Sequence, residues 1–293
     1  MTRRYTRKQP VRNLRRAVFV VLLAGALASC SSQGEAEHPL PVAPAGHERW
    51  VYNPAISDEF DGTTLDTTKW FDHNPTWMGR QPSLFRPENV RVEQGMLILT
   101  GRRQQVEDAP EGYHTFTSAA VQSKHKVLYG FFEIRCRPMR SALSSAFWLY
   151  VQDSAKQEEI DIFEICGRHD SDSAYPHTYF ATSHYILKPQ GVQISDHVAH
   201  MSPVPWADRT FVAGFKWTRD ELVWYVDGQE IRRRKNDYWH SPETINFDSE
   251  AFPSWWGLPS AEDSGGQFEI DYFRYWSDPR SQSELTIFPN DMQ

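Results

Sequence analysis

Three carboxylates lie within an otherwise apolar stretch, QEEIDIFEICG, which runs from Gln157 to Gly167. Charged side chains avoid apolar surroundings unless they are paired or have a function. On a helix, the step of about 100° per residue would turn Glu159 away from Asp161 and Glu164. On a strand, Glu159 and Asp161 share one face, and a β-bulge near residues 162–163 would return Glu164 to that face. The spacing therefore predicts a bulged strand with one acidic and one apolar face.

Carboxylates that share a face repel one another, so at least one of them has a raised pKa. Retaining cleavage of a glycosidic bond needs such a set, with an ionised nucleophile and a protonated acid about 5 Å apart. We assign Glu159 as the nucleophile, Asp161 as the assisting acid and Glu164 as the general acid/base. Two other interpretations use the same side chains: a solvated acidic strand face, and a site where three carboxylates share a cation. Glu158 falls on the opposite face, where we expect a solvated charge near the strand end.

The elements that must position these residues are short strands. From Trp50 onward, alternating runs are separated by turn residues, and no segment predicts a long amphipathic helix. The segment VWYVDGQEIRR predicts a hairpin with Asp227 and Gly228 in its turn. Many short strands over the remaining length, without an internal repeat, predict an all-β fold: a β-sandwich of the jelly-roll type.

The N-terminal residues predict export from a bacterial cell. Seven basic residues and no acidic one lie in residues 1–16, and an apolar run follows over residues 17–28. This pattern is typical of a secretory signal peptide, and its apolar core is too short to span a bilayer stably. LASC, from Leu27 to Cys30, resembles a bacterial lipobox, in which the cysteine is lipidated and becomes the mature N-terminus. An ordinary signal peptide with a chance cysteine is the alternative. We expect a lipoprotein of the cell envelope, held at the outer membrane by its lipid alone.

The composition along the chain predicts four segments. They are a lipoprotein signal peptide over residues 1–29, a flexible linker rich in Pro, Ala and Ser over 31–48, a catalytic domain over 49–280, and a C-terminal tail over 281–293.

The charge and the cysteines limit the classes of partner. Removal of the signal peptide takes away seven of the 31 basic residues and none of the 38 acidic ones, which leaves a net charge of −14. This charge argues against a nucleic-acid partner, although a few arginines could still hold an anionic ligand. After lipidation of Cys30, only Cys136 and Cys166 remain, and the sequence leaves their pairing open. No Cys or His spacing indicates a zinc site.

Several motifs in order resemble one enzyme family. EIDIFE resembles the signature of glycoside hydrolase family 16, in the form with two residues between the Asp and the second Glu, and the resemblance covers roughly residues 50–277. The other matching segments, in chain order, are SDEFDGTTLDTTKW, NVRVEQGMLILTGRR, GFFEIRCRP, SSAFWLY, GFKWTRDELVWYVDGQEIRR and FEIDYFRYW, the first as the opening strand. The resemblance implies a concanavalin A-like sandwich with a concave substrate cleft, retaining hydrolysis of β-linked glucans or galactans, and no cofactor for catalysis.

One loop indicates the polysaccharide. The W-x-G-R-x-P core of DHNPTWMGRQPSLF, from Asp72 to Phe85, resembles a loop of agarases, porphyranases and related red-algal galactan hydrolases. Trp77 could stack on a galactose face, and Arg80 could hold a hydroxyl or sulfate through paired hydrogen bonds. The alternative is a loop whose Trp closes the sandwich and whose Arg pairs with a surface acid. The resemblance favours a neutral or sulfated red-algal galactan over laminarin.

The same resemblance implies further substrate contacts. YFATSHY, from Tyr179 to Tyr185, resembles a strand that brings a histidine, here His184, to the cleft, and His177 is a second candidate just upstream. Trp148 in AFWLY resembles the aromatic floor under the sugar at the cleavage point. The Trp255-Trp256 pair in PSWWGLP forms either an outer subsite or a hydrophobic plug.

Many members of this family carry a structural calcium ion on the convex side, away from catalysis. The matching positions here are Glu59 and Asp271, whose oxygens suit a hard cation. An ordinary salt bridge is the alternative at these positions.

Together these features predict a monomeric, lipid-anchored, endo-acting retaining glycosidase that cuts a red-algal β-galactan of the agarose, porphyran or furcellaran/carrageenan type. A β-1,3-glucanase of the laminarinase type is the alternative within the class. A non-catalytic carbohydrate-binding lipoprotein would have lost a catalytic carboxylate, yet Glu159 and Glu164 are both present. A structural calcium-binding sandwich would need Glu159, Asp161 and Glu164 to share a cation.

Overall fold

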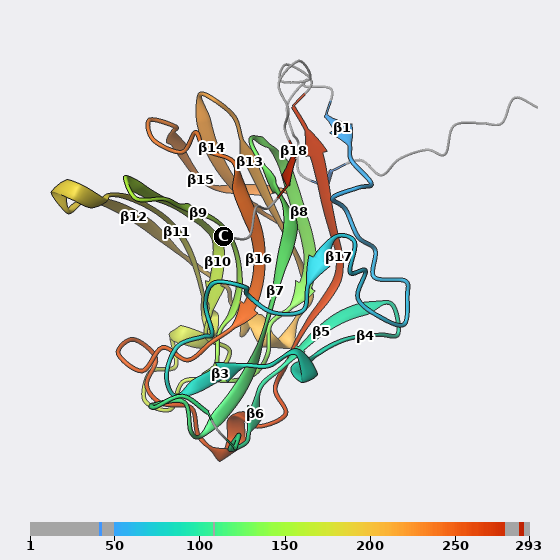
Figure 1. The fold of residues 1–293 in the computed structure, drawn as a ribbon, viewed down its shortest axis with the longest axis vertical. Coiled ribbons are helices and arrows are strands. Elements are labelled where there is room, and N and C mark those ends of the chain that lie inside the picture. The colour runs from blue at the N-terminus through green and yellow to red at the C-terminus, as the bar shows by residue number, and fades with distance from the viewer. Residues whose placement is uncertain (1–40, 43–49, 108, 279–286, 290–293) are drawn as a thin grey trace, which may run out of the picture. The chain divides into compact units, whose positions relative to one another are not determined.

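The computed structural model describes residues 41–42, 50–107, 109–278 and 287–289, in which two curved β-sheets face each other as a sandwich (Figure 1). The predicted signal peptide and Cys30 lie outside the described residues, as do most of the predicted linker and tail. No helix in the described ranges is both long and apolar enough to cross a membrane.

The first sheet, sheet A, has the strand order β15-β14-β13-β8-β17-β5-β4, and β1 pairs with β17. Its neighbouring strands are antiparallel. The strands of sheet A are β1 (Val51–Tyr52), β4 (Val90–Glu93), β5 (Met96–Thr100), β8 (Gly130–Arg137), β13 (Phe211–Trp217), β14 (Glu221–Val226), β15 (Gln229–Lys235) and β17 (Gln267–Ser277).

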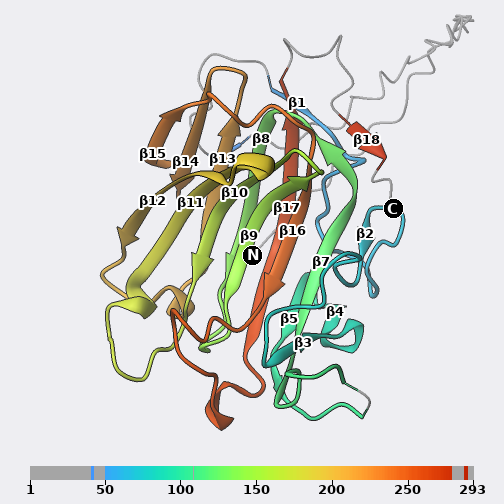
Figure 2. The same ribbon diagram turned by 60° about the vertical axis from the view of Figure 1, so that its left-hand side comes forward.

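The second sheet, sheet B, has the order β12-β11-β10-β9-β16-β7-β18, whose central strands lie side by side in Figure 2. Three short strands also pair with β7, and the β3 pair is parallel, unlike the rest. The strands of sheet B are β2 (Trp70–Phe71), β3 (Ser83–Phe85), β6 (Arg102–Arg103), β7 (Phe116–Val127), β9 (Ser145–Gln152), β10 (Lys156–Ile165), β11 (Thr178–Leu187), β12 (Val192–Met201), β16 (Glu243–Ser249) and β18 (Ile287–Pro289).

Short 3-10 helices connect some of these strands. In the described part of the chain they are η1 (Pro87–Asn89), η2 (Tyr175–His177), η3 (Lys188–Gln190), η4 (Trp206–Asp208) and η5 (Ala261–Asp263).

The predicted all-β jelly-roll class is confirmed, and so is the predicted hairpin. β14 and β15 are joined by Asp227 at φ 48° and Gly228 at φ 79°, and positive φ at both central residues is what a type I′ turn requires. The predicted opening strand is wrong for most of its length. Asp58 forms a single bridge with Phe273, and turns then continue until β2 begins at Trp70.

The space between the sheets holds the core, because alternating side chains of both sheets point into it. The largest fully buried rings of this core are those of Trp70, Trp206, Trp217, Trp224, Trp239, Tyr179, Tyr275, Phe60, Phe132 and Phe147, whereas Phe131 and Trp276 belong to a separate, smaller cluster. The described part of the predicted linker contacts this domain, since the Val42 backbone N–H donates to the Glu133 carboxylate at 2.6 Å. The rings of the main core pack beneath sheet B, on the side opposite its acidic face.

Candidate active site

Strand β10 carries the three carboxylates, and its pairing shifts where the spacing required a bulge. Its register with β11 shifts between Asp161 and Glu164, and its register with β9 shifts between Asp161 and Phe163. The predicted bulge is therefore confirmed. It leaves Phe163 fully buried in the core and returns Glu164 to the face of Glu159 and Asp161, where all three line one cavity.

Two indoles hold the backbone of this strand from the core side. The Trp224 indole N–H on β14 donates to the Asp161 carbonyl at 3.0 Å. The Trp239 indole N–H donates to the carbonyls of Glu159 and His184, each at 3.0 Å. Because a bulge disrupts the ladder locally, a carbonyl beside it needs another donor, and Trp224 supplies one. Both tryptophans therefore position the carboxylates without reaching the cavity.

Glu158 is not the solvated charge that alternation suggested. Its side chain is fully buried and accepts hydrogen bonds from the backbone N–H groups of His240 at 3.0 Å and Ser241 at 2.9 Å. The Ser241 hydroxyl and the Lys156 ammonium also donate to it, at 2.8 and 2.5 Å. The segment before β16 folds over this face, so the carboxylate holds that segment to β10.

The acidic face of β10 opens into a cavity of about 290 Å³ on sheet B. Side chains from β9, β10 and β16 form its floor, and the loops after β2 and β16 form its sides. The lining residues are Asn74, Thr76, Trp77, Arg80, Ala146, Trp148, Tyr150, Gln152, Glu159, Asp161, Glu164, Asp248, Glu250 and Phe252.

Two further carboxylates, Asp248 and Glu250, enter the cavity from the end of β16 and were not predicted. Asp248 lies opposite Ala146 of β9, and its Oδ2 accepts the Trp148 indole N–H at 2.8 Å. Glu250 accepts from the Arg80 guanidinium, with a closest distance of 2.7 Å. The cavity therefore gathers five carboxylates around one arginine.

Burial dominates the electrostatics of the cavity, because desolvation disfavours each carboxylate anion. It raises the pKa of Glu159 to about 7, although hydrogen bonding from Gln157 and the charge of Arg80 oppose the shift. Burial together with the negative charges of Glu159 and Asp248 raises the pKa of Glu164 to about 8. Burial, and then the neighbouring Glu164 and Glu159, raise the pKa of Asp161 well above its usual range. Glu159 therefore ionises before Glu164, which is the order that a nucleophile and a general acid need.

The pKa values of the two β16 carboxylates are raised as well. Burial raises the pKa of Glu250 to about 8, against the opposing hydrogen bond from Arg80. Burial and the charge of Glu250 raise the pKa of Asp248 well above its usual range. The cavity thus retains protons near neutral pH, as an acid-catalysed bond cleavage requires.

The loop between β2 and β3 places Trp77 and Arg80 at the cavity, where the sequence predicted them. The Trp77 ring contacts Trp148 edge-on, with ring centroids 6.3 Å apart. Gly79 between them has φ 102°, a backbone conformation that favours glycine, and its carbonyl accepts from the Tyr113 hydroxyl at 2.9 Å. Arg80 pairs with buried Glu250 inside the cavity rather than with a surface acid.

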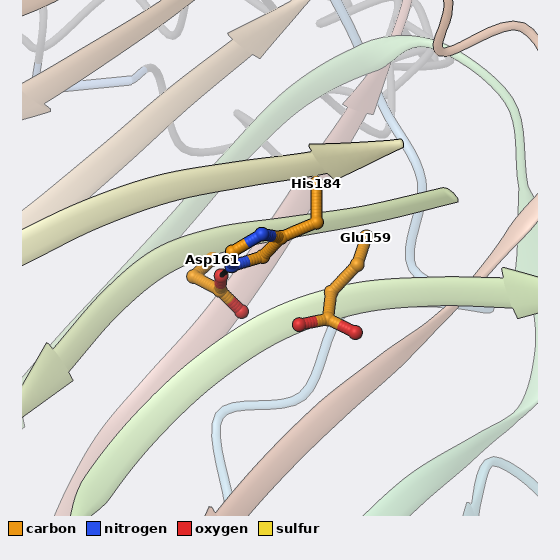
Figure 3. Close-up of side chains that lie close together, drawn as sticks. All are labelled: Glu159, Asp161 and His184. Carbon is orange, nitrogen blue, oxygen red and sulfur yellow. Dashed lines mark ion pairs between the residues drawn. The ribbon is translucent and has the colours of Figure 1, made fainter. Parts of the chain in front are cut away.

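His184 lies beside Glu159 and Asp161, on the side of β10 where it was predicted. Figure 3 shows its imidazole next to the Asp161 carboxylate, and Nε2 is 3.6 Å from Asp161 Oδ2. Its Nδ1 lies 2.7 Å from the Ser195 hydroxyl. Burial lowers the pKa of His184. The ligand atoms of Glu159, Asp161 and His184 lie within 4.8 Å of one another. This donor set contains a nitrogen and differs from the three-oxygen calcium site weighed as an alternative.

The comparison with protein families agrees with this geometry. Residues 50–277 match the family model described as "Beta-porphyranase A-D, GH16 domain". The chain belongs to this family. It is a glycoside hydrolase of family 16, and the three carboxylates of the motif lie on β10 within the matched region.

Individual relatives bear out the assignment. The chain is similar to beta-porphyranase D of Zobellia galactanivorans, with 29% identity over 87% of this chain and 68% of that protein. It is also similar to an extracellular agarase of Streptomyces coelicolor, with 32% identity over 72% of this chain and 74% of that protein. The fold matches the crystal structure of porphyranase B from Zobellia galactanivorans with a TM-score of 0.71, covering 83% of this chain and 99% of that one at 22% identity.

Other predicted residues lie away from the cavity. His177, a predicted substrate contact, is at the end of η2, where its Nδ1 lies 2.9 Å from the Ser202 carbonyl, and it does not line the cavity. The position of His184 on β11 pairs it with Glu159 of β10, whereas His177 precedes β11. The thiols of Cys136 and Cys166, whose pairing the sequence left open, are buried and free.

The two predicted calcium ligands are engaged by different arginines. The Glu59 carboxylate accepts two hydrogen bonds from Arg274, both at 2.8 Å, and Asp271 pairs with Arg135. Each carboxylate is thus neutralised by a guanidinium, which agrees with the salt-bridge alternative. We assign no cation to this pair.

Proposed function

We propose that this chain is an endo-acting, retaining hydrolase of a red-algal β-galactan of the agarose, porphyran or furcellaran/carrageenan type. The observation that carries the proposal is the bulge in β10, because it places Glu159, Asp161 and Glu164 together on the wall of one cavity. A solvated acidic strand face does not account for three carboxylates held in a partly enclosed site with raised pKa values.

In the first step, the ionised Glu159 carboxylate attacks the anomeric carbon and forms a glycosyl ester. Glu164 donates its proton to the glycosidic oxygen as the bond to the leaving sugar breaks. In the second step, Glu164 takes a proton from a water molecule, whose oxygen attacks the anomeric carbon and releases Glu159. Asp161 lies between the two glutamates on the strand, and its retained proton can hydrogen-bond a neighbouring carboxylate.

The galactan assignment rests on the aromatic and cationic groups around these carboxylates. Trp77 and Trp148 meet edge-on at the cavity and present ring surface to an apolar sugar face. Arg80 is held by Glu250 on one side, and half of its side chain is exposed to a ligand. The names of the porphyranase and agarase relatives support the same substrate class.

A reducing-end assay of the domain on agarose, porphyran, furcellaran, κ-carrageenan and laminarin tests the proposal. We expect new reducing ends from at least one galactan, and a loss of at least about 100-fold in Glu159→Ser and Glu164→Ser. Glu93→Ser, at an exposed position on β4, is the matched control and should retain the rate. Activity on laminarin alone would overturn the galactan assignment. Wild-type rates in either cavity variant would overturn the mechanism.

We further propose that the mature protein is a monomeric lipoprotein of the cell envelope, anchored through Cys30 at the outer membrane. The lipobox-like LASC sequence supports this location. In the native host, Cys30→Ala should move the protein from the membrane fraction to the soluble fraction, and Ser32→Ala should leave it in the membrane fraction. Equal membrane recovery of the Cys30→Ala variant would contradict the anchor.

A further inference from the structure

Aromatic side chains continue beyond the end of the cavity where Glu164 lies. Glu164 pairs with Ala146 of β9 and Phe180 of β11, so this end of β10 adjoins the loops that carry residues 166–177 and 250–258. The two tryptophans of the second loop, Trp255 and Trp256, differ in their exposure. Trp256 is 2% exposed and acts as a plug, whereas Trp255 is partly exposed.

The rings form a continuous strip that begins in the cleavage cavity. Phe252, which lines that cavity, contacts Trp255 with ring centroids 5.5 Å apart. Trp255 contacts Phe180 at 4.8 Å, and Phe180 contacts Tyr175 at 6.2 Å. Tyr175 stacks on His169 at 4.6 Å with an angle of 28° between the ring planes. We call these five residues the aromatic strip.

The outer part of the aromatic strip lines a second cavity of about 480 Å³. Trp255, Tyr175 and His169 contribute partly exposed rings to it, and Leu258 beside them is 66% exposed. Exposed apolar groups that adjoin a binding cavity, with a polar rim, are typical of a ligand site.

The polar groups around the second cavity argue against an anionic ligand. Asp170 and Asp172 line it with exposed carboxylates. The guanidinium of Arg168, the residue next to His169, is already bound by Asp263 and Asp170. His169 Nδ1 accepts the backbone N–H of Asp172 at 2.9 Å, so this nitrogen carries no proton in that contact. The described residues that line this cavity include no Lys or Arg, and such a set of rings suits an uncharged ligand with an apolar face.

We propose that the aromatic strip is an outer subsite that binds a sugar unit of the same polysaccharide chain, remote from the bond that is cleaved. A sugar ring presents a C–H face for stacking and hydroxyls for the acidic rim, which matches both features of the second cavity. The strip is continuous with the cleavage cavity through Phe252, so one extended chain can occupy both. This inference rests on the proposed function.

Binding without turnover tests the subsite directly. In a Glu159→Gln background, electrophoresis through gels that contain agarose, porphyran, κ-carrageenan or laminarin reports the affinity for each polymer. We expect Tyr175→Ala to weaken retardation by the galactan by about fivefold in dissociation constant, the factor that corresponds to one lost stacking contact. Tyr238→Ala is the matched control, because Tyr238 stacks on Tyr185 at 5.0 Å and 28° and lines neither cavity.

Chain length provides the second readout. In the otherwise wild-type enzyme, Tyr175→Ala should lower kcat/KM by about fivefold on long galactan chains and leave it unchanged on the shortest oligosaccharide that is cleaved. Unchanged cleavage of the short substrate also shows that the variant is folded. An equal loss on both lengths, or unaltered retardation in the gels, would overturn the subsite. Binding and cleavage of laminarin alone would instead overturn the galactan assignment, and the length dependence on that polymer would still test the strip.

Discussion

The raised pKa values of Glu159 and Glu164, the proposed nucleophile and general acid/base, lead to a quantitative pH profile for kcat/KM. With a nucleophile of pKa about 7 and an acid of pKa about 8, the form with Glu159 ionised and Glu164 protonated is most abundant near pH 7.5. At pH 5.5 only about 3% of Glu159 is ionised, so kcat/KM should be about 20-fold below its maximum. Ordinary glutamates would place the acidic limb near pH 4.5 instead.

The variant Glu164→Ala distinguishes the acidic limb of the kcat/KM profile, assigned to Glu159, from the basic limb, assigned to Glu164. On an oligosaccharide with an activated aryl leaving group, the glycosidic oxygen needs no proton, so this variant should keep the acidic limb and lose the basic limb. The initial rates at low substrate concentration, measured from pH 5 to 10, give kcat/KM for wild type and variant. Glu93→Ala, at an exposed position on β4, is the control and should show both limbs. A basic limb that persists in Glu164→Ala, or an acidic limb near pH 4.5 in the wild type, would refute the assignment.

Three further predictions concern the groups around the site. Glu243 is fully buried, its carboxylate oxygens accept no hydrogen bond from the described residues, and burial raises its pKa well above 4.5. Because its pKa is raised in the folded state, the buried Glu243 carboxyl is fully tolerated below pH 4.5, and the fold loses stability as the pH rises above that value. Glu243→Gln should therefore raise the free energy of unfolding by up to about 4 kcal/mol at pH 7.5 and by little at pH 4, as measured in urea titrations. Glu158→Ala should lower that free energy by about 3–5 kcal/mol in the same titration, because the buried donors that now contact the carboxylate would lose their acceptor. Equal stability would contradict the proposal that Glu158 holds the segment before β16 to β10. Arg80→Met should move the acidic limb of kcat/KM above pH 7, because the arginine charge lowers the pKa of Glu159, and an unmoved limb would show that Arg80 acts only on substrate.

The catalytic strand could be predicted from its own residues because the relevant physics is local. Alternation fixed the faces of Glu159 and Asp161, and the extra residue before Glu164 required a bulge. The turn at Asp227 and Gly228 could be predicted for the same reason, since its backbone conformation needs these residue types.

The rest of the site depends on contacts between distant segments. Asp248 and Glu250 lie more than eighty residues from β10, and only the pairing of β16 with β9 brings them to the cavity. The polar residues Asn246, Asp248 and Glu250 at every second position were a usable signal of a strand with one polar face. Glu158 was misjudged because alternation gives a face but does not reveal that the segment before β16 covers it. Nothing in the sequence indicates that the indoles of Trp224 and Trp239 would donate hydrogen bonds to the backbone of β10.

Rescue of glycine variants by azide distinguishes the nucleophile from the general acid/base, because the anomer formed identifies the role of each glutamate. With an activated aryl oligosaccharide, Glu159→Gly plus azide should form the α-glycosyl azide, since azide displaces the leaving group directly in the space of the missing nucleophile. Glu164→Gly plus azide should form the β-glycosyl azide, since azide attacks the glycosyl ester on Glu159. The proton NMR spectrum of each product distinguishes the anomers. We expect the α anomer from Glu159→Gly and the β anomer from Glu164→Gly. The reverse pair, or rescue of neither variant, would contradict the assigned roles.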